Sequence, residues 1–175
     1  MKIEGKNAVL ELLKTDKTID KILVQNGMRD EASRALVKEA VRIGAKVQYV
    51  EKTILDKESP SRRHQGFIAF VSDYEYADFD ELLINLKDKP KATVLVLDGI
   101  EDPHNLGSII RVGECSGADA IIISKRRSAQ VSDAVMRISA GSANHISVCR
   151  VTNINNAIDK LKDASLWVYG LEVGG

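Results

Sequence analysis

Residues 93–124 read TVLVLDGIEDPHNLGSIIRVGECSGADAIIIS, and this stretch decides the fold. Two short apolar runs, 93–97 and 120–123, flank a segment with helical spacing, 106–115, which Gly117 ends. Continuous apolar strands separated by helices are typical of a parallel sheet that is covered on both faces. The stretch therefore predicts an α/β domain whose functional side chains gather in the loops that follow the strands.

The alternation of apolar strands and helices continues towards the C-terminus. We expect a second helix over residues 131–140, a third strand over 146–149, a helix that Thr152 caps, and a fourth strand over 166–169. Together with the opening stretch, these elements predict a domain over residues 91–175 that is built on a parallel sheet.

A smaller α/β pattern precedes this domain. Residues 29–43 have the apolar spacing of an amphipathic helix that Gly44 ends, and residues 67–71 form a continuous apolar run typical of a buried strand. We therefore expect a separate small α/β domain over residues 1–72. Residues 73–90 are rich in acidic side chains, and we interpret them as a solvated linker followed by a short helix.

The chain has 25 basic and 25 acidic side chains, and therefore a formal net charge of zero. This balance excludes a histone-like protein that holds nucleic acid by its bulk charge. The charge is unevenly spread, however. Residues 1–72 carry 14 basic and 10 acidic side chains, residues 73–102 carry 3 and 9, and residues 103–175 carry 8 and 6. Two mildly basic blocks thus flank an acidic one.

Several features are typical of a cytoplasmic protein without a membrane partner. No apolar run approaches the ~18 residues of a membrane span, and the first residues lack the apolar segment of a secretion signal. Cys115 and Cys149 are not spaced as a redox pair, and we interpret them as reduced, buried thiols. Together with His104 and His145 they lack the paired spacing of zinc ligands, so no metal is expected.

The loop and helix after the first strand, residues 98–111, carry the densest group of special residues. The segment has neither the glycine fingerprint of a dinucleotide site nor a P-loop, which disfavours a nucleotide-binding oxidoreductase. Pro103 fixes the approach of the chain, Asn105 can cap the helix, and Gly107 lets another group come near the backbone. By composition alone, a capping sequence followed by an exposed Arg111 explains the segment as well as a functional site does.

Two other loops combine positive charge with hydrogen-bonding groups. One precedes the strand at 67–71, and the other follows the strand at 120–123. Such side chains suit RNA phosphates and unpaired bases, although a solvated loop is the ordinary explanation for adjacent cations. The candidate RNA-binding residues are Arg62, Arg63, His64 and Gln65 in the first loop, and Lys125, Arg126, Arg127 and Ser128 in the second.

Several of these segments resemble one known family. The run DPHNLGSIIR at 102–111 resembles the first motif of the SpoU/TrmH family of RNA ribose 2′-O-methyltransferases, in the SPOUT superfamily. Residues 117–128, 139–145 and 150–153 are similar to further segments of that family, closest to its RlmB-type ribosomal RNA enzymes. Residues 3–9 resemble the start of the RNA-recognition domain of those enzymes. The resemblance implies a ribosomal-protein-like α/β RNA-binding domain followed by a parallel-sheet SPOUT (α/β knot) methyltransferase domain.

The resemblance also implies a reaction. Methyl would pass from S-adenosylmethionine to a ribose 2′-hydroxyl, with a guanosine of 23S rRNA as the expected target, transfer RNA as an alternative, and a homodimer as the active form. Arg111 matches the catalytic arginine, and Asn105 helps to shape the site. Because a guanidinium stays protonated, we favour Arg111 gripping a phosphate and stabilising the alkoxide over its acting as a base. Glu114 could orient Arg111 or form an ordinary surface pair with it.

The resemblance covers the chain but not the whole pattern of the family. There, a Gly-rich loop with a glutamate and a Ser/Asn-containing knot segment follow the fourth strand and supply most of the cofactor pocket. We expect both motifs, and therefore the cofactor-binding residues, C-terminal to Gly175. On this expectation the 175 residues alone are inactive, and the alternative is an RNA-binding module without catalysis.

Overall fold

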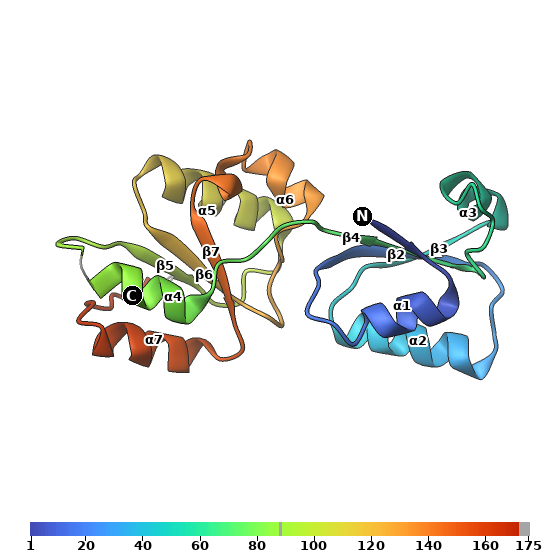
Figure 1. The fold of residues 1–175 in the computed structure, drawn as a ribbon, viewed down its shortest axis with the longest axis horizontal. Coiled ribbons are helices and arrows are strands. Elements are labelled where there is room, and N and C mark those ends of the chain that lie inside the picture. The colour runs from blue at the N-terminus through green and yellow to red at the C-terminus, as the bar shows by residue number, and fades with distance from the viewer. Residues whose placement is uncertain (88, 172–175) are drawn as a thin grey trace. The chain divides into compact units, whose positions relative to one another are not determined.

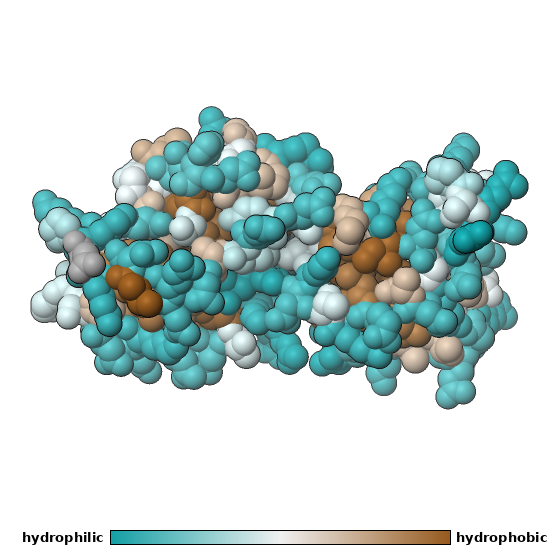
Figure 2. Space-filling view, in the orientation of Figure 1, coloured by the Kyte–Doolittle hydropathy of each residue, from teal (hydrophilic) through white to brown (hydrophobic). Residues whose placement is uncertain are grey.

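The computed structural model describes residues 1–87 and 89–171. The chain folds into two compact units, Met1–Tyr74 and Glu75–Gly175 (Figure 1). On the face that Figure 2 presents, the surface is mostly hydrophilic and apolar side chains are confined to small patches. No helix in the described part of the chain is long and apolar enough to cross a membrane.

The first unit is a mixed sheet with helices on both faces. The order of its elements is β1 (Lys2–Glu4), α1 (Lys6–Leu12), β2 (Ile19–Gln25), α2 (Glu31–Arg42), β3 (Val47–Val50), α3 (Lys52–Glu58) and β4 (Phe67–Val71). The strands lie in the order β1-β4-β2-β3, with β2 and β3 parallel and the other pairs antiparallel. The parallel pair arises because α2 carries the chain across from the end of β2 to the start of β3.

The alternation of side chains along β2 determines which helices cover each face of this sheet. Ile22 packs on one face with Val9 of α1 and Leu36 of α2. Leu23, the next residue, points to the opposite face and packs with Leu55 of α3. All five side chains are almost completely buried. Each such burial is worth about 1.5–3 kcal/mol, so the alternation fixes both helical layers.

The second unit is a three-layer α/β structure. Its elements are α4 (Phe79–Lys87), β5 (Val94–Leu97), α5 (Pro103–Cys115), β6 (Ala120–Ser124), α6 (Asp133–Ile138), a 3-10 turn (Ser142–Asn144), β7 (Ser147–Val151) and α7 (Ile154–Asp163). The three strands are parallel, in the order β5-β6-β7. Helices α5 and α6 lie on one face of the sheet, and α4 and α7 on the other (Figure 1). The α/β class and the parallel sheet are thus confirmed. The cap predicted at Thr152 is wrong, because Asn153 caps α7 by accepting from the Asn156 N–H at 3.1 Å.

Two glycines let α5 lie close to its neighbours. A Cβ at Gly107 would lie 2.7 Å from both Cβ and Cγ2 of Ile138 in α6. A Cβ at Gly113 would lie 2.9 Å from Cδ1 of Leu95 in β5. Carbon atoms in contact normally stand about 3.5–4.0 Å apart, so a side chain at Gly107 would push the two helices apart. The prediction that Gly107 permits a close approach is confirmed, and α6 is the element that approaches.

The fourth strand predicted over residues 166–169 is wrong. These residues have no regular secondary structure. Trp167 and Tyr169 are 88% and 83% exposed, although a strand in a sheet covered on both faces would be buried. A strand requires a hydrogen-bonded neighbour, and in the part of the chain that the structure describes no strand edge pairs with this segment.

The segment before α4 is also different from the solvated linker that its acidic residues predicted. The hydroxyl of Tyr76 accepts a hydrogen bond from the Val131 N–H at 2.8 Å, and the guanidinium of Arg150 lies 4.0 Å from the centroid of the Tyr76 ring. Ala77 forms a parallel bridge with Cys149. The aromatic ring and the backbone therefore dock this segment on the sheet, even though its charged residues favour water.

Candidate functional site

The β5–α5 loop is shaped by a cap at the start of α5. Asp102 is the N-cap residue, and its side chain accepts a hydrogen bond from the His104 N–H at 2.9 Å. Pro103 occupies the first turn, where its missing N–H costs nothing. The prediction that Asn105 caps this helix is wrong. Because Asp102 with Pro103 already satisfies the helix start, Asn105 lies inside the first turn with its side chain exposed.

Arg111 lies on the same helix and is exposed. Within residues 1–87 and 89–171 it forms no ion pair. It lies six positions after Asn105, which in an α-helix means about 9 Å along the axis and about 120° around it. The two predicted catalytic side chains therefore do not share one face of α5. Arg111 is left available for an anionic partner.

Glu114 does not pair with Arg111. Its Oε2 atom instead accepts from the Ser142 hydroxyl at 3.5 Å and from the Cys115 thiol at 3.5 Å. Of the two roles considered for Glu114, an orienting contact and a surface ion pair, neither is present in the structure. The carboxylate connects α5 with the turn that precedes β7.

The structure brings the loop after β6 against the loop after β5. The Ala129 N–H donates to the carbonyl oxygen of Ile100 at 2.7 Å, and the Ser128 hydroxyl donates to the same oxygen at 3.3 Å. The Gln130 amide donates to the carbonyls of Ser124 and Ser128, at 2.9 and 3.0 Å, and so closes the loop on itself. The basic residues Lys125, Arg126 and Arg127 are exposed on this loop. The two segments thus share one edge of the parallel sheet, as the strand order predicts.

In the first unit, the predicted RNA-binding residues lie on the loop between α3 and β4, residues 59–66. Arg62, Arg63 and Gln65 are exposed. His64 is not, because only 3% of this residue is exposed. The prediction that His64 faces RNA together with its neighbours is therefore corrected: the backbone of the loop turns this one side chain inward.

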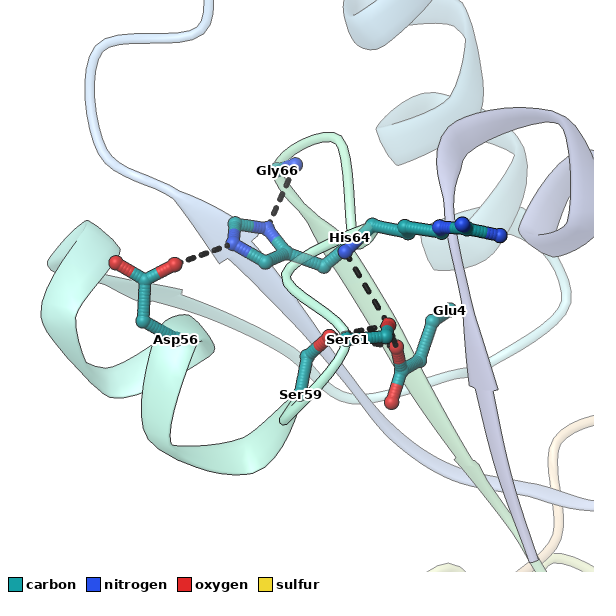
Figure 3. Close-up of polar contacts among 7 residues, drawn as sticks. Glu4, Asp56, Ser59, Ser61, His64 and Gly66 are labelled. Carbon is teal, nitrogen blue, oxygen red and sulfur yellow. Dashed lines mark hydrogen bonds and ion pairs between the residues drawn. The ribbon is translucent and has the colours of Figure 1, made fainter.

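Polar contacts hold the ring of His64 in place, as Figure 3 shows. Nε2 lies 3.1 Å from Oδ1 of Asp56 in α3, and Nδ1 accepts from the Gly66 N–H at 3.0 Å. The hydrogen bond with His64 holds the pKa of the Asp56 carboxyl below its usual range, and the positive charges of Lys52 and Arg62 act in the same direction. The sequence offered no signal for this pairing, since the two residues lie on different elements.

Two cavities, one in each unit, differ in whether charged side chains line them. One of about 350 Å³ lies between α5 and β5 and is lined by Thr93, Leu95, Ser108, Ile109, Val112, Gly113, Ser116 and Ala118. No charged side chain lines it, so it does not suit S-adenosylmethionine, whose carboxylate and ammonium groups need polar partners. One of about 210 Å³ in the first unit is lined by Val24, Met28, Ser33, Arg34, Val37, Lys38 and Tyr49.

The two cysteines have different environments. Cys149 is buried in β7, and burial, together with the nearby charge of Asp78, raises the pKa of its thiol to about 11. Cys115 is exposed, which corrects the prediction that both thiols are buried, since α5 turns this residue away from the sheet. In the described ranges no group of three or more His, Cys, Asp or Glu side chains could hold a metal ion.

Comparison with protein families gives matches in both units. Residues 92–175 match the model of the SpoU rRNA methylase family. Residues 2–77 match the model described as RNA 2′-O ribose methyltransferase substrate binding. The two matched ranges follow the division of the chain into two units.

Individual relatives give the same family. A TrmH family tRNA/rRNA methyltransferase of Staphylococcus epidermidis is 44% identical over 97% of this chain and 68% of its own length. The corresponding protein of Staphylococcus haemolyticus is 43% identical over the same shares.

Among solved structures, an rRNA methyltransferase from Sinorhizobium meliloti has a TM-score of 0.43 at 22% identity, over 93% of this chain and 58% of its own. The SpoU methyltransferase AviRb from Streptomyces viridochromogenes, in complex with AdoMet, has a TM-score of 0.46 at 17% identity, over 94% and 59%. This chain thus spans less than two thirds of the length of these solved proteins.

Proposed function

This chain belongs to the SpoU/TrmH family of RNA methyltransferases, and from that premise we propose that the protein methylates the 2′-hydroxyl of a ribose in RNA. The observation that carries the proposal is the similarity to TrmH family methyltransferases at 44% identity over nearly the whole chain. The geometry supports it, because the loop after β6 donates hydrogen bonds to the Ile100 carbonyl in the loop after β5 and presents three basic side chains at this edge of the sheet.

We propose S-adenosylmethionine as the methyl donor. When bound, it supplies an electrophilic sulfonium methyl group. The cavity beside α5 does not suit it, so no step is assigned to that cavity. The expectation that the cofactor-binding residues follow Gly175 stays a prediction, as does the homodimer.

Arg111 is proposed as the residue that acts on the reacting ribose. A hydroxyl is a poor nucleophile until its proton leaves, and a fixed positive charge stabilises the alkoxide that forms. A guanidinium can in addition hold an adjacent phosphate through two parallel hydrogen bonds. Its exposure and lack of an ion pair in the described ranges leave Arg111 free for both tasks. Asn105, about 9 Å away along the helix axis and about 120° around it, is proposed to shape the site rather than to act with Arg111.

The Arg111→Lys variant tests this role. Lysine keeps the charge but loses the planar pair of donors, so we expect methyl transfer to fall by about 100-fold. Incorporation of labelled methyl into RNA, with RNA binding measured separately, gives the result. Arg42→Lys is the matched control, because Arg42 pairs with Glu39 on the surface of the other unit. Near-normal methyl transfer in Arg111→Lys would remove the case for a guanidinium-specific role.

We propose that Arg126 and Arg127 in one unit, and Arg62 and Arg63 in the other, contact RNA phosphates. Lys125, Ser128 and Gln65 are proposed as additional contacts. All four arginines are exposed. A few such contacts give a modest fall of affinity with salt, which suits a chain whose net charge is zero.

The proposed target is a guanosine of 23S rRNA in the cytoplasm. Mapping of 2′-O-methyl groups in RNA from a strain that lacks the gene tests this directly. The proposal expects one ribosomal ribose to lose its methyl group and to regain it on complementation. Loss of a methyl group from transfer RNA instead would replace the ribosomal target. An unchanged methylation pattern together with intact RNA binding would favour an RNA-binding module without catalysis.

A further inference from the structure

His64 is an almost fully buried ionisable side chain that the proposed reaction does not use. It lies between two exposed neighbours, Arg63 and Gln65. We propose that His64, held by Asp56, is a positioning residue that fixes the shape of the loop of residues 59–66 for binding RNA phosphates. This inference rests on the proposed function, since it concerns how the loop meets RNA.

The partners of the two ring nitrogens identify the tautomer of His64. The Gly66 N–H can only donate, and it points at Nδ1 from 3.0 Å, so Nδ1 accepts and carries no hydrogen. In the neutral ring the hydrogen is therefore on Nε2, which donates it to Oδ1 of Asp56 at 3.1 Å. One ring thus connects α3 to the residue that precedes β4 by two hydrogen bonds of opposite sense.

The loop has backbone conformations that an unsupported loop avoids. Arg62 and Gln65 have φ angles of 52° and 49°, in the left-handed region that residues with a side chain rarely adopt. Gly66 follows with φ of 83°, and a Cβ there would lie 2.2 Å from Sδ of Met28. Such conformations persist only where the surroundings hold them. The buried ring of His64 lies between the two left-handed residues and supplies that support.

A second group holds the other end of the loop (Figure 3). Oε2 of Glu4, in β1, accepts from the hydroxyls of Ser59 at 2.6 Å and Ser61 at 3.1 Å. The Ser61 hydroxyl in turn accepts from the Arg63 N–H at 3.3 Å. The backbone is therefore held on both sides of the two arginines, while their guanidinium groups stay exposed.

A loop that His64 holds rigid can bind RNA more tightly even though His64 itself does not contact the RNA. Arginines on a flexible loop lose conformational freedom when they bind phosphate, and that loss weakens the complex. A loop already held in its bound shape avoids most of it. Loss of the His64–Asp56 hydrogen bond should therefore weaken RNA binding although every exposed cation is still present.

The experiment compares four variants of the full chain: His64→Ala, Asp56→Ala, Asp56→Asn and the double variant Arg62→Ala/Arg63→Ala. The probe is a fluorescein-labelled RNA hairpin with an unpaired loop, and anisotropy is followed over a range of KCl concentrations. Each lost phosphate contact lowers the slope of log affinity against log salt by ~0.7 for single strands, so the double variant should lower it by ~1.4.

His64→Ala and Asp56→Ala should weaken binding about 10-fold, because the loop must be ordered on binding. Their slope should stay near that of the wild type, because both arginines remain and still contact phosphates. Asp56→Asn keeps an acceptor for the Nε2 hydrogen, so it should bind RNA almost as the wild type does. Rescue by this variant separates a positioning role from a requirement for the negative charge.

Hydrogen exchange distinguishes a local effect from unfolding. The Gly66 amide should exchange faster in Asp56→Ala, while the amides of β2 and β4 keep their protection. If His64→Ala does not fold, Asp56→Ala carries the test, because the Asp56 side chain is partly exposed.

Wild-type affinity in Asp56→Ala would overturn the inference. If the double arginine variant is also unaffected, this loop does not meet RNA, and that part of the proposed function fails with it. If only the double variant weakens binding, the RNA contact stands and the positioning role alone is wrong.

Discussion

Substitution of Gly107 by alanine tests the packing that places α5, the helix that carries Arg111. The new methyl group would lie 2.7 Å from Cβ and Cγ2 of Ile138 and 3.3 Å from the Ser139 backbone nitrogen. The Cβ of Ile138 is attached directly to the backbone of α6 and cannot rotate away. To reach a normal contact of about 3.5–4.0 Å, α6 would have to move by about 1 Å.

Two opposing effects set the magnitude. Replacing glycine by alanine inside a helix stabilises it by about 0.5–1 kcal/mol, because the unfolded chain has less freedom to lose. Overpacking of a close contact costs about 1–3 kcal/mol. The net expectation for Gly107→Ala is a loss of about 1 kcal/mol in the free energy of unfolding of this unit. For a domain of this size, that corresponds to a fall of about 4–8 °C in Tm.

Gly113→Ala in the same helix is the matched control. Its methyl group would meet only Cδ1 of Leu95 at short range, 2.9 Å away. That atom is the far end of a flexible side chain, and Leu95 also lines the cavity of about 350 Å³, so it has room to move. We expect Gly113→Ala to be neutral or to stabilise the unit by about 0.5 kcal/mol.

Thermal unfolding, combined with hydrogen exchange of amides in α5 and β6, measures the free energy of unfolding of the second unit in both variants. The reasoning predicts opposite signs, or at least a difference of about 1 kcal/mol, between two chemically identical substitutions in one helix. Equal stability of Gly107→Ala and Gly113→Ala would refute it, because helix propensity alone would then account for both.

Two further predictions follow from the structure. At pH 8, iodoacetamide should modify the exposed Cys115 and leave the buried Cys149 unmodified in the folded protein, as mass spectrometry of peptides can show. Burial raises the pKa of the Cys149 thiol from 9.0 to about 11. The contribution of this thiol to stability is therefore complete below pH 9 and is lost as the pH rises towards 11. Asp102→Ala should lower the free energy of unfolding by about 1 kcal/mol, as measured by thermal unfolding. Asp102→Asn keeps a capping oxygen and should cost little. Equal losses in the two variants would contradict the capping role of Asp102.

The sequence predicted the second unit well where local signals agree. Apolar runs at β5 and β6 with a helical pattern between them permit few arrangements, and the parallel sheet followed. The family resemblance, carried by residues 102–111, is confirmed by the relatives. The candidate loops after β5 and β6 were also found together, because the carboxyl ends of parallel strands share an edge.

The errors arose where distant contacts decide the outcome. An apolar run such as 166–169 has strand propensity, but it forms a strand only if a neighbour is present. The Tyr76 hydroxyl holds its segment on the sheet by accepting a hydrogen bond from the Val131 N–H, and the acidic residues around Tyr76 gave no sign of this contact. His64 was grouped with the cations around it, since nothing in the order SRRHQG reveals that one side chain of the loop turns inward towards Asp56.

The cap of α5 was a different kind of error, because the signal was present. Asp102 followed by Pro103 is a well-known helix start, with an acceptor at the N-cap and proline in the first turn. Asn105 is an equally good capping residue type, and residue preference alone does not choose between them. The position of Pro103 favours Asp102, because proline is over-represented at the first helical position, which directly follows the N-cap.

The two basic loops share one feature that connects the neutral chain to its proposed RNA partner. Each has an exposed arginine in the left-handed region: Arg62 with φ of 52° and Arg127 with φ of 53°. This conformation costs roughly 1–2 kcal/mol per residue, so each loop needs compensating contacts. In one loop they come from His64 and Glu4, and in the other from Gln130 and the Ile100 carbonyl. A chain without excess positive charge cannot hold RNA by its overall field. It can instead fix a small number of cations in advance, so that each contact is made with little further loss of freedom.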